Sequence, residues 1–262
     1  GDDRNETVAV DLTPEMPITR IVTREVPVTN EETSSEVSQE LDTQHRAEQA
    51  VSNYLTSLVN KVTDANTREV LLGSVDPLSS RSSRDPNSSR WQVWTNGVNF
   101  ENGVPVERSP MPWYVSLEGG EQNVAPGESH SRQWQKVITD QADLISWAGR
   151  TWCLMGGTNN EIWDRVIDEQ LAISSVAESI RTVESQFLSS KAPEGAQYHF
   201  NLFREYFDTY FKFIESQKRS PSSAETGDLA QSSIDSVGHA WTEFSGFAVD
   251  RYWWALPKDC LD

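Results

Sequence analysis

Apolar residues recur at every third or fourth position over much of this chain, which is the spacing of an amphipathic helix. The first such stretch covers residues 34–63, and its apolar positions are Val37, Leu41, Val51, Leu55, Leu58 and Val62. Gln44 and Glu48 interrupt the stripe, so we expect the first half of this helix to be more exposed than the second. At roughly 1.5 Å per residue the helix is about 45 Å long, enough to pack along a bundle or to extend from it as a stalk.

Four further stretches have the helical period. They run from about residue 130 to 149, from Thr158 to Phe187, from Pro193 to Ser220, and from about residue 225 to Ala248. The second opens with Thr158-Asn-Asn-Glu161, the spacing of a capping box. Together with residues 34–63, these stretches predict an antiparallel bundle of four or five helices.

Residues from about 89 to 120 follow a different pattern, in which apolar and polar residues alternate as they do in strands. Trp91-Gln-Val-Trp94 and Val98-Asn-Phe100 flank Asn96-Gly97, a pair typical of hairpin turns, and Pro112–Leu117 follows as another short strand. Two or three short strands are not stable alone, so we expect them to lean on the helices. The sequence therefore predicts a mainly α fold, a helical bundle with a small β insertion.

The first 33 residues show no helical period. They predict an extended acidic leader, or tether, in front of one domain that covers residues 34–262. Within the leader, residues 18–29 alternate β-branched and polar side chains, and Pro27 disfavours a place inside a sheet.

This segment, Ile18-Thr-Arg-Ile-Val-Thr-Arg-Glu-Val-Pro-Val-Thr29, resembles repeats that follow the lipid-anchored cysteine in surface lipoproteins and solute-binding proteins of green non-sulfur bacteria. The resemblance covers about twelve residues and includes no catalytic motif, so it implies a compartment and a tether only. The chain also opens with Gly1-Asp-Asp, without Met or an apolar signal segment, as a processed exported protein would. We therefore expect an extracytoplasmic location, either secreted or on the cell surface.

The charge of the chain limits its partners. It has 40 acidic and 22 basic residues, a net charge of −18, which argues against nucleic-acid binding because phosphate recognition needs a basic face. Residues 1–50 hold twelve acids and four arginines, so repulsion would keep a tether extended and soluble. No apolar run approaches the roughly 20 residues that span a bilayer. We expect another envelope protein or a membrane anchor as partner.

The two cysteines, Cys153 and Cys260, allow one disulfide. In an exported protein it would tie the C-terminal tail to the bundle and contribute about 3–5 kcal/mol by loop closure, if the geometry allows it. In a cytosolic protein the same residues would be two thiols. We expect the disulfide.

Motifs for catalysis or metal binding are missing from the sequence. No Glu-x-x-His pair accompanies His45, His130, His199 or His239, so we expect neither a di-iron centre nor any other metal or cofactor. Gly127-Glu-Ser129-His130-Ser131 begins like a nucleophile elbow but ends in serine where the motif has glycine, and we interpret it as the polar entry to a helix. No catalytic residues are assigned.

Tryptophan is the outstanding residue, with ten in the chain. Trp152 and Trp163, with the nearby carboxylates Glu161 and Asp164, could line a sugar cleft in which rings stack on pyranose faces. The simpler alternative is that Glu161 caps a helix and Asp164 complements its dipole. Sugar binding without hydrolysis could instead use the tryptophans of the β insertion. These are Trp91, Trp94 and Trp113.

Two apolar stretches could either pack inside the fold or bind another chain. The aromatic residues between Tyr198 and Ile214 cover more than one helix face, so this helix is either central or a docking surface for another chain. Tyr252-Trp-Trp-Ala-Leu256 is too apolar for a free tail, and we expect it to pack across the bundle near Cys153 or, failing that, against a partner.

We therefore expect a non-enzymatic extracytoplasmic module that binds a ligand or another protein, as part of a surface lipoprotein or envelope complex. The first alternative is a carbohydrate-binding or carbohydrate-active protein. It would show two carboxylates about 5–10 Å apart beside exposed tryptophans. The second alternative is a structural subunit of a virion or appendage, which would assemble through residues 1–33.

Overall fold

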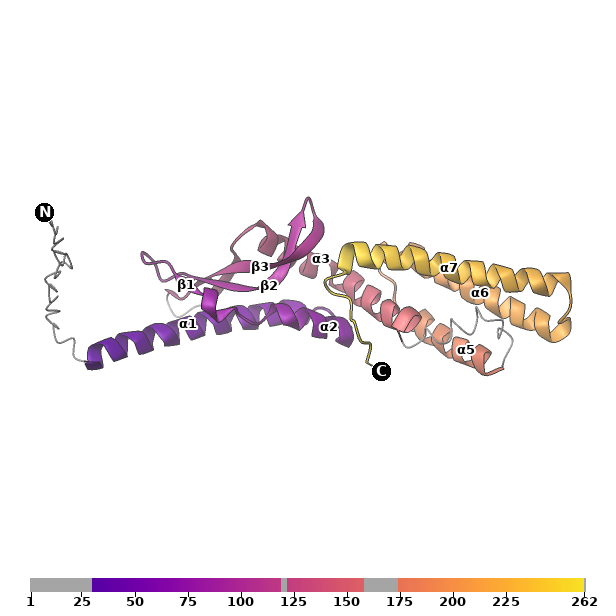
Figure 1. The fold of residues 1–262 in the computed structure, drawn as a ribbon, viewed down its shortest axis with the longest axis horizontal. Helices are drawn as coiled ribbons and strands as arrows, with labels where there is room; N and C mark the ends of the chain where they lie inside the picture. The colour runs from indigo at the N-terminus through magenta and orange to yellow at the C-terminus, as the bar shows by residue number, and fades with distance from the viewer. Residues whose placement is uncertain (1–29, 119–121, 158–173, 262) are drawn as a thin grey trace, which may run out of the picture. The chain divides into compact units, whose positions relative to one another are not determined.

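Figure 1 shows the fold in a computed structural model, which describes residues 30–118, 122–157 and 174–261. Most of the predicted tether lies outside the described residues, as does the first half of the helix expected from Thr158. The chain divides into two compact units, Gly1–His45 and Arg46–Asp262, and helix α1 (Asn30–Val59) carries residues of both.

In the first unit, the described side chains belong to the N-terminal part of α1. Residues 34–42 are all exposed, and the exposed fractions of Val37 and Leu41 are 53% and 60%. In the second unit, by contrast, Ala47 and Val51 of the same helix are fully buried. The expectation that the first half of this helix is the more exposed is therefore confirmed.

The second unit combines helices with a sheet (Figure 1). After α1, the helices are α2 (Ala65–Leu71), α3 (Ser129–Trp152), α5 (Ser174–Ser189), α6 (Gln197–Arg219) and α7 (Ala224–Tyr252). The strands are β1 (Ser83–Arg84), β2 (Trp91–Glu101), β3 (Val104–Ser116) and β4 (Asn123–Pro126). Short turns complete the described elements: the 3-10 turns η1 (Leu72–Ser74), η2 (Ser79–Arg81) and η5 (Glu194–Ala196), and the π-helical turn η4 (Cys153–Gly157).

Local chemistry explains where several helices begin. Asp64 precedes α2 and Ser223 precedes α7, and each side chain accepts a hydrogen bond from the backbone N–H three residues later. At the start of α3, the Glu128 N–H donates to the Ser131 hydroxyl over 3.0 Å. The Gly127–Ser131 segment is therefore the polar entry to a helix, as predicted.

The strands form one antiparallel sheet in the order β1-β2-β3-β4. The long β2–β3 hairpin turns at Asn102-Gly103, whose φ angles of 51° and 79° suit a two-residue turn. The expected turn at Asn96-Gly97 is instead inside β2. Gly97 has a packing role there, because a Cβ at this position would lie 2.4 Å from the sulfur of Met111 on β3.

The inner face of the sheet packs against α1 and α3. Trp113 of β3 is fully buried, with its ring centroid 6.1 Å from that of Tyr54 in α1 and 6.2 Å from that of Trp134 in α3. The Trp113 indole N–H donates to the hydroxyl of Thr95 on β2 over 3.1 Å. Tyr54 also bonds to Gln135 of α3, so helices and sheet share one core.

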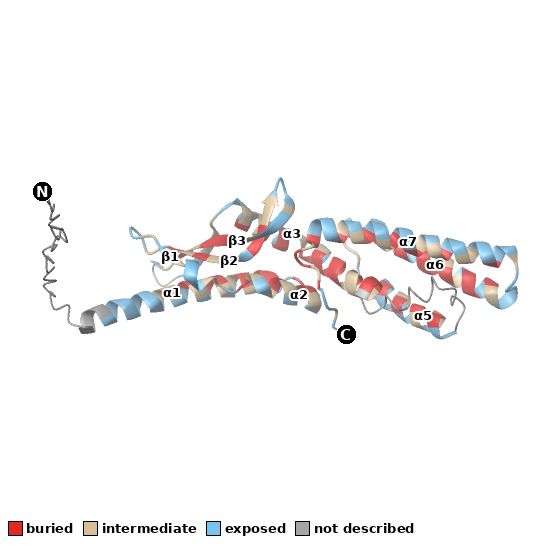
Figure 2. Cartoon of the chain, viewed as in Figure 1, coloured by how far each residue is buried: buried red, intermediate tan, exposed pale blue. Residues whose placement is uncertain are grey.

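The remaining helices build a second aromatic cluster around α6 and α7, which lie side by side. The ring centroid of Phe203 in α6 is 5.5 Å from that of Phe187 in α5 and 5.8 Å from that of Phe244 in α7. The guanidinium of Arg181 covers Phe211 at 3.5 Å. The aromatic helix is therefore central, and Figure 2 shows its buried residues where it faces α7.

The expected fold class is wrong. The described residues form six α-helices together with a four-stranded antiparallel sheet, and the sheet is a layer with its own helical cover rather than an appendage of a simple bundle. The reason is that the second half of α1 and the first half of α3 bury their apolar stripes on strands, through Tyr54 and Trp134. The helical period is the same whether a helix packs on helices or on a sheet.

The predicted disulfide is present. Cys153, just after α3, is bonded to Cys260, with the two Cα atoms 5.5 Å apart. The Tyr252–Leu256 segment packs on the β2–β3 hairpin, where the Trp254 ring lies 6.1 Å from that of Phe100, and on α3, where the Tyr252 hydroxyl donates to Gln141. Among the described helices, none is long and apolar enough to cross a membrane.

Candidate functional site

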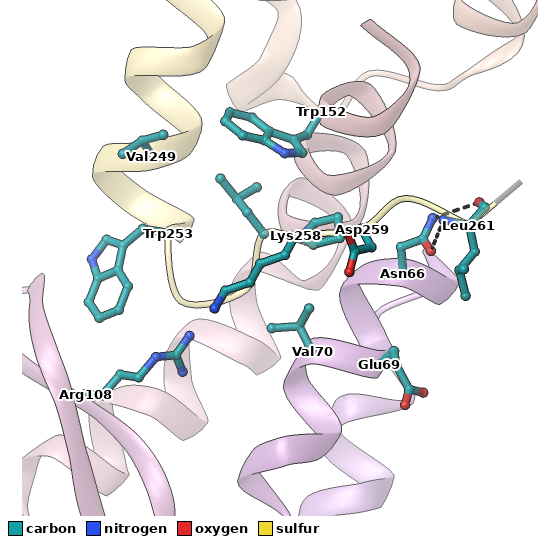
Figure 3. A pocket seen from close by; sticks show the side chains of 12 residues that line it. Asn66, Glu69, Val70, Arg108, Trp152, Val249, Trp253, Lys258, Asp259 and Leu261 are labelled. Atoms are coloured by element: carbon teal, nitrogen blue, oxygen red, sulfur yellow. Dashed lines mark hydrogen bonds between the residues drawn. The ribbon is translucent and has the colours of Figure 1, made fainter. Parts of the chain in front are cut away.

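A groove opens in the second unit between α2, strand β3 and the end of the chain (Figure 3). Its volume is about 770 Å³, within the range of about 300–1,000 Å³ that is usual for small-molecule sites. The side chains that define its chemistry are Asn66 and Glu69 of α2, Arg108 of β3, Trp152 of α3, and Trp253, Lys258 and Asp259 after α7.

One wall is the C-terminal strap, which we define as residues 257–261. The disulfide from Cys260 to Cys153 fixes it covalently to the end of α3. Beside it, the Leu261 N–H donates to the Asn66 side-chain oxygen over 3.0 Å, and the Asn66 amide donates back to the Leu261 carbonyl over 3.3 Å. The disulfide at Cys260 and the hydrogen bonds at Leu261 hold the strap in place, and this fixes Lys258 and Asp259 along the groove.

The other walls carry two indole rings. Trp152 packs on Trp241 of α7 with ring centroids 5.5 Å apart. Trp241 in turn lies on the backbone of Gly156, where a Cβ would come within 2.4 Å of the indole. The Trp253 indole N–H donates to the carbonyl of Pro105 over 3.1 Å, which fixes its ring against the hairpin.

The charges of the groove are arranged unevenly. The Arg108 guanidinium lies 5.6 Å from the centre of the Trp253 ring, and Lys258 extends from the strap on the same side of the groove (Figure 3). Neither cation forms an ion pair with a carboxylate of the described residues. Figure 3 shows the Glu69 carboxylate turned away from both indoles. The carboxylates of Glu69 and Asp259 line the groove as well. The part of the groove around Arg108, Lys258 and the Trp253 ring is the part suited to an anion.

This arrangement can bind a ligand that has both an apolar body and a negative group. The indoles, with Val70, Val249 and Leu256, offer apolar surface, and the cations offer charged donors at one side. Such a combination, mostly apolar with a few polar groups that orient the ligand, is typical of small-molecule sites.

The structure separates the tryptophans that the sequence singled out. Trp91 and Trp113 are core residues, with exposed fractions of 2% and 0%, so they present no ring to a ligand. Trp94 is half-buried on the opposite face of the sheet. Trp152 alone of the described candidates lines the groove. The remaining three, Glu161, Trp163 and Asp164, lie outside the described residues.

Of the seven side chains that define the chemistry of the groove, sequence reasoning chose Trp152 and missed the other six: Asn66, Glu69, Arg108, Trp253, Lys258 and Asp259. For Trp253 the sequence predicts packing near Cys153 as part of an apolar tail, and it does not predict a binding role. The pair Cys153 and Cys260 is the signal in the sequence, because a disulfide between them brings the end of the chain close to the end of α3 and hence to Trp152. No feature of the sequence marks Arg108 as a binding residue, because its position beside the groove depends on the length of the β2–β3 hairpin.

The histidines do not form a site in the described part of the chain, where no group of His, Cys, Asp or Glu could hold a metal. His130 lies 2.9 Å from the carbonyl of Pro110 and 3.5 Å from Glu128, and so links α3 to the sheet. His199 is buried among aromatic rings, with Phe247 at 4.6 Å. Burial lowers its pKa below the ordinary value, and the nearby Glu243 opposes that effect.

Known proteins offer no assignment for this groove. Comparisons with protein-family models, with curated proteins and with solved structures find no match to the chain.

Proposed function

We propose that this chain is a non-enzymatic binding module that works outside the cytoplasm, as part of a surface lipoprotein or envelope complex. The observation that carries the proposal is the groove, which Trp152 and Trp253 line together with Arg108 and Lys258, two cations that form no ion pair among the described residues. The disulfide supports the location, because disulfides form and persist in oxidising compartments.

The ligand class follows from the chemistry of the groove walls. An apolar body would displace water from the two indoles, and a carboxylate would accept hydrogen bonds from Arg108 and Lys258. A hydrogen bond to a charged group is worth about 1.5–3 kcal/mol, or roughly 10- to 100-fold in affinity. Removing either cation should therefore weaken binding of an anionic ligand by about that factor.

Isothermal titration calorimetry tests this with three probes: decanoate, which is apolar and anionic, octyl glucoside, which is apolar and neutral, and a glucuronate oligosaccharide, which is an anionic sugar. We expect decanoate to bind more tightly than octyl glucoside, and the Arg108→Ala and Lys258→Ala variants to lose that preference. Arg219→Ala, on an exposed residue at the end of α6, is the control. Equal binding of decanoate by all four proteins would refute the site.

A carbohydrate-binding or carbohydrate-active protein is the second candidate, because Glu69 and Asp259 line the same groove as Trp152 and Trp253. In that case the glucuronate oligosaccharide would bind and decanoate would not. Hydrolysis of the oligosaccharide, lost in Glu69→Gln or Asp259→Asn, would further distinguish an enzyme from a binding protein.

The location has its own test. Mass spectrometry of the native protein reads both the N-terminus and the state of Cys153 and Cys260. A processed or lipidated N-terminus with the disulfide intact is the expected result. Free thiols together with an unprocessed N-terminus would contradict an extracytoplasmic location.

A further inference from the structure

The face of the sheet that points away from α1 and α3 carries aromatic residues. We call it the outer sheet face and define it by its partly exposed residues, Gln92 and Trp94 of β2 and Tyr114 of β3; Pro112 of β3 is on the same face but is buried beside Gly127. The strand register places Trp94 opposite Pro112 and Gln92 opposite Tyr114. Trp94 and Tyr114 are therefore diagonal neighbours on this face, within reach of one another's side chains. Both are only partly buried.

Each of these rings carries a stacked arginine. The guanidinium carbon of Arg81 lies 4.3 Å from the centre of the Trp94 ring, and that of Arg90 lies 4.2 Å from the centre of the Tyr114 ring. Stacking fixes the plane of a guanidinium and leaves its N–H edges free. Each of the two stacked groups can therefore pair with a carboxylate that approaches this face.

No carboxylate of the described residues pairs with these stacked arginines. Arg81 and Arg90 are exposed and form no ion pair there, and neither does Arg84, which is exposed on the neighbouring strand β1. Glu118, the acidic residue that follows β3, accepts a hydrogen bond from Ser89 instead. Three arginines without an ion pair in the described part of a chain whose net charge is −18 mark a surface for an acidic partner.

The chain itself carries a surface that fits. Residues 34–45 of α1 include Glu36, Glu40 and Asp42 and no lysine or arginine. Val37 and Leu41, one helical turn apart, are exposed there at 53% and 60%. Each follows a glutamate in the sequence, so the apolar pair and the two glutamates form adjoining strips along the helix. The apolar strip suits aromatic rings and the glutamate strip suits guanidinium groups.

We propose that the outer sheet face of one copy of the chain binds residues 34–45 of a second copy. Val37 and Leu41 cover the exposed parts of Trp94 and Tyr114, while Glu36 and Glu40 pair with Arg81 and Arg90. The two surfaces differ, so the contact is head to tail, and it produces a closed ring or an open chain of subunits.

Sedimentation velocity of the full chain at increasing concentration is the primary test. We expect the mass to rise from that of one chain, 29.5 kDa, toward its multiples at low salt. Screening at about 0.5 M salt should shift the association toward monomer, because exposed charges interact little beyond a Debye length of a few ångströms. A chain that stays monomeric at all concentrations in low salt overturns the proposal.

Charge reversal identifies the two surfaces. The Arg81→Glu/Arg90→Glu variant should stay monomeric, because its acidic face repels the acidic helix. The Glu36→Arg/Glu40→Arg variant should also stay monomeric, for the opposite reason. When mixed, the two variants present complementary surfaces to each other and should associate at least tenfold more tightly than either does alone.

The matched control is Lys218→Glu/Arg219→Glu, which makes the same change in charge at exposed positions at the end of α6. This variant should associate as the unmodified chain does. Circular dichroism and melting temperature establish that every variant is folded. Loss of association in the control, or mixed variants that remain monomeric, would also overturn the proposal, since charge alone or another surface would then be responsible.

Discussion

Gly149 of α3 lies against Thr67 of α2, and this contact positions the helix that supplies Asn66 and Glu69 to the groove. A Cβ at position 149 would come within 1.7 Å of the Thr67 hydroxyl oxygen and 3.0 Å of its Cβ. Thr67 is fully buried and has little room to move. Its hydroxyl and its N–H both donate to the Asp64 carboxylate, over 2.6 and 3.0 Å, and so hold the cap of α2.

Gly149→Ala should therefore destabilise the protein. Overpacking of a close-packed core costs about 1–3 kcal/mol, and disturbance of the Asp64 cap costs about 1 kcal/mol. The higher helix propensity of alanine compared with glycine offsets about 1 kcal/mol of this loss. The expected loss is about 2 kcal/mol, or roughly 4–8 °C in melting temperature for a unit of this size.

Gly238→Ala in α7 is the matched control. Gly238 is exposed, and apart from its chain neighbours and the backbone of its own helix, nothing lies within 4 Å of a Cβ at that position. Helix propensity alone should then stabilise the protein by up to about 1 kcal/mol. Thermal unfolding followed by circular dichroism measures both variants. If Gly149→Ala melted at or above the unmodified chain, the close contact between α2 and α3 would be refuted.

Three further predictions concern stability. Replacing Cys153 and Cys260 by alanine removes a bond across 107 residues and should cost about 4–5 kcal/mol, measured by urea unfolding, whereas a change under 1 kcal/mol would contradict the loop-closure estimate. The lowered pKa of His199 means that the unfolded chain binds a proton more readily than the folded chain, so stability should fall as pH drops below about 6.5. Melting curves at pH 7 and 5 should show a smaller fall in His199→Gln, and an unchanged fall would refute that assignment. Gly103→Ala places a side chain at φ 79° and should lower the melting temperature by roughly 2–4 °C, the effect of about 1 kcal/mol, whereas an unchanged value would contradict the turn at this position.

Most helices could be predicted because their apolar stripes are long. The stretch expected from about residue 130 to 149 is α3, and the stretch expected from about residue 225 is α7. Helix α2 was missed, since its seven residues are too few for a period to be recognised. The sheet was underestimated for a different reason: β3 contains Pro105, Pro110 and Pro112, and proline argues against a long strand in any sequence-based interpretation.

The groove was harder to predict than the helices. Trp152 could be chosen because tryptophan is a frequent binding residue, but the same argument chose Trp91 and Trp113, which are buried. Periodicity distinguishes an apolar face from a polar one, and it does not distinguish a ring that faces the core from one that faces a cavity. That distinction depends on contacts between distant residues, such as Trp253 with Pro105.

Helix α3 shows why the fold class could not be read from periodicity. Its first half packs on the sheet through Trp134, and its second half packs on the helices through Trp147, whose ring lies 5.7 Å from that of Phe244. Between them, Gln141 leaves the helical conformation, with φ −120° and ψ 18°, and its side chain accepts a hydrogen bond from the Tyr252 hydroxyl. The apolar stripe nevertheless continues through the kink, because both halves bury one face. A single helix can therefore belong to two different cores, one with a sheet and one with helices, while the period of its sequence predicts one continuous apolar face.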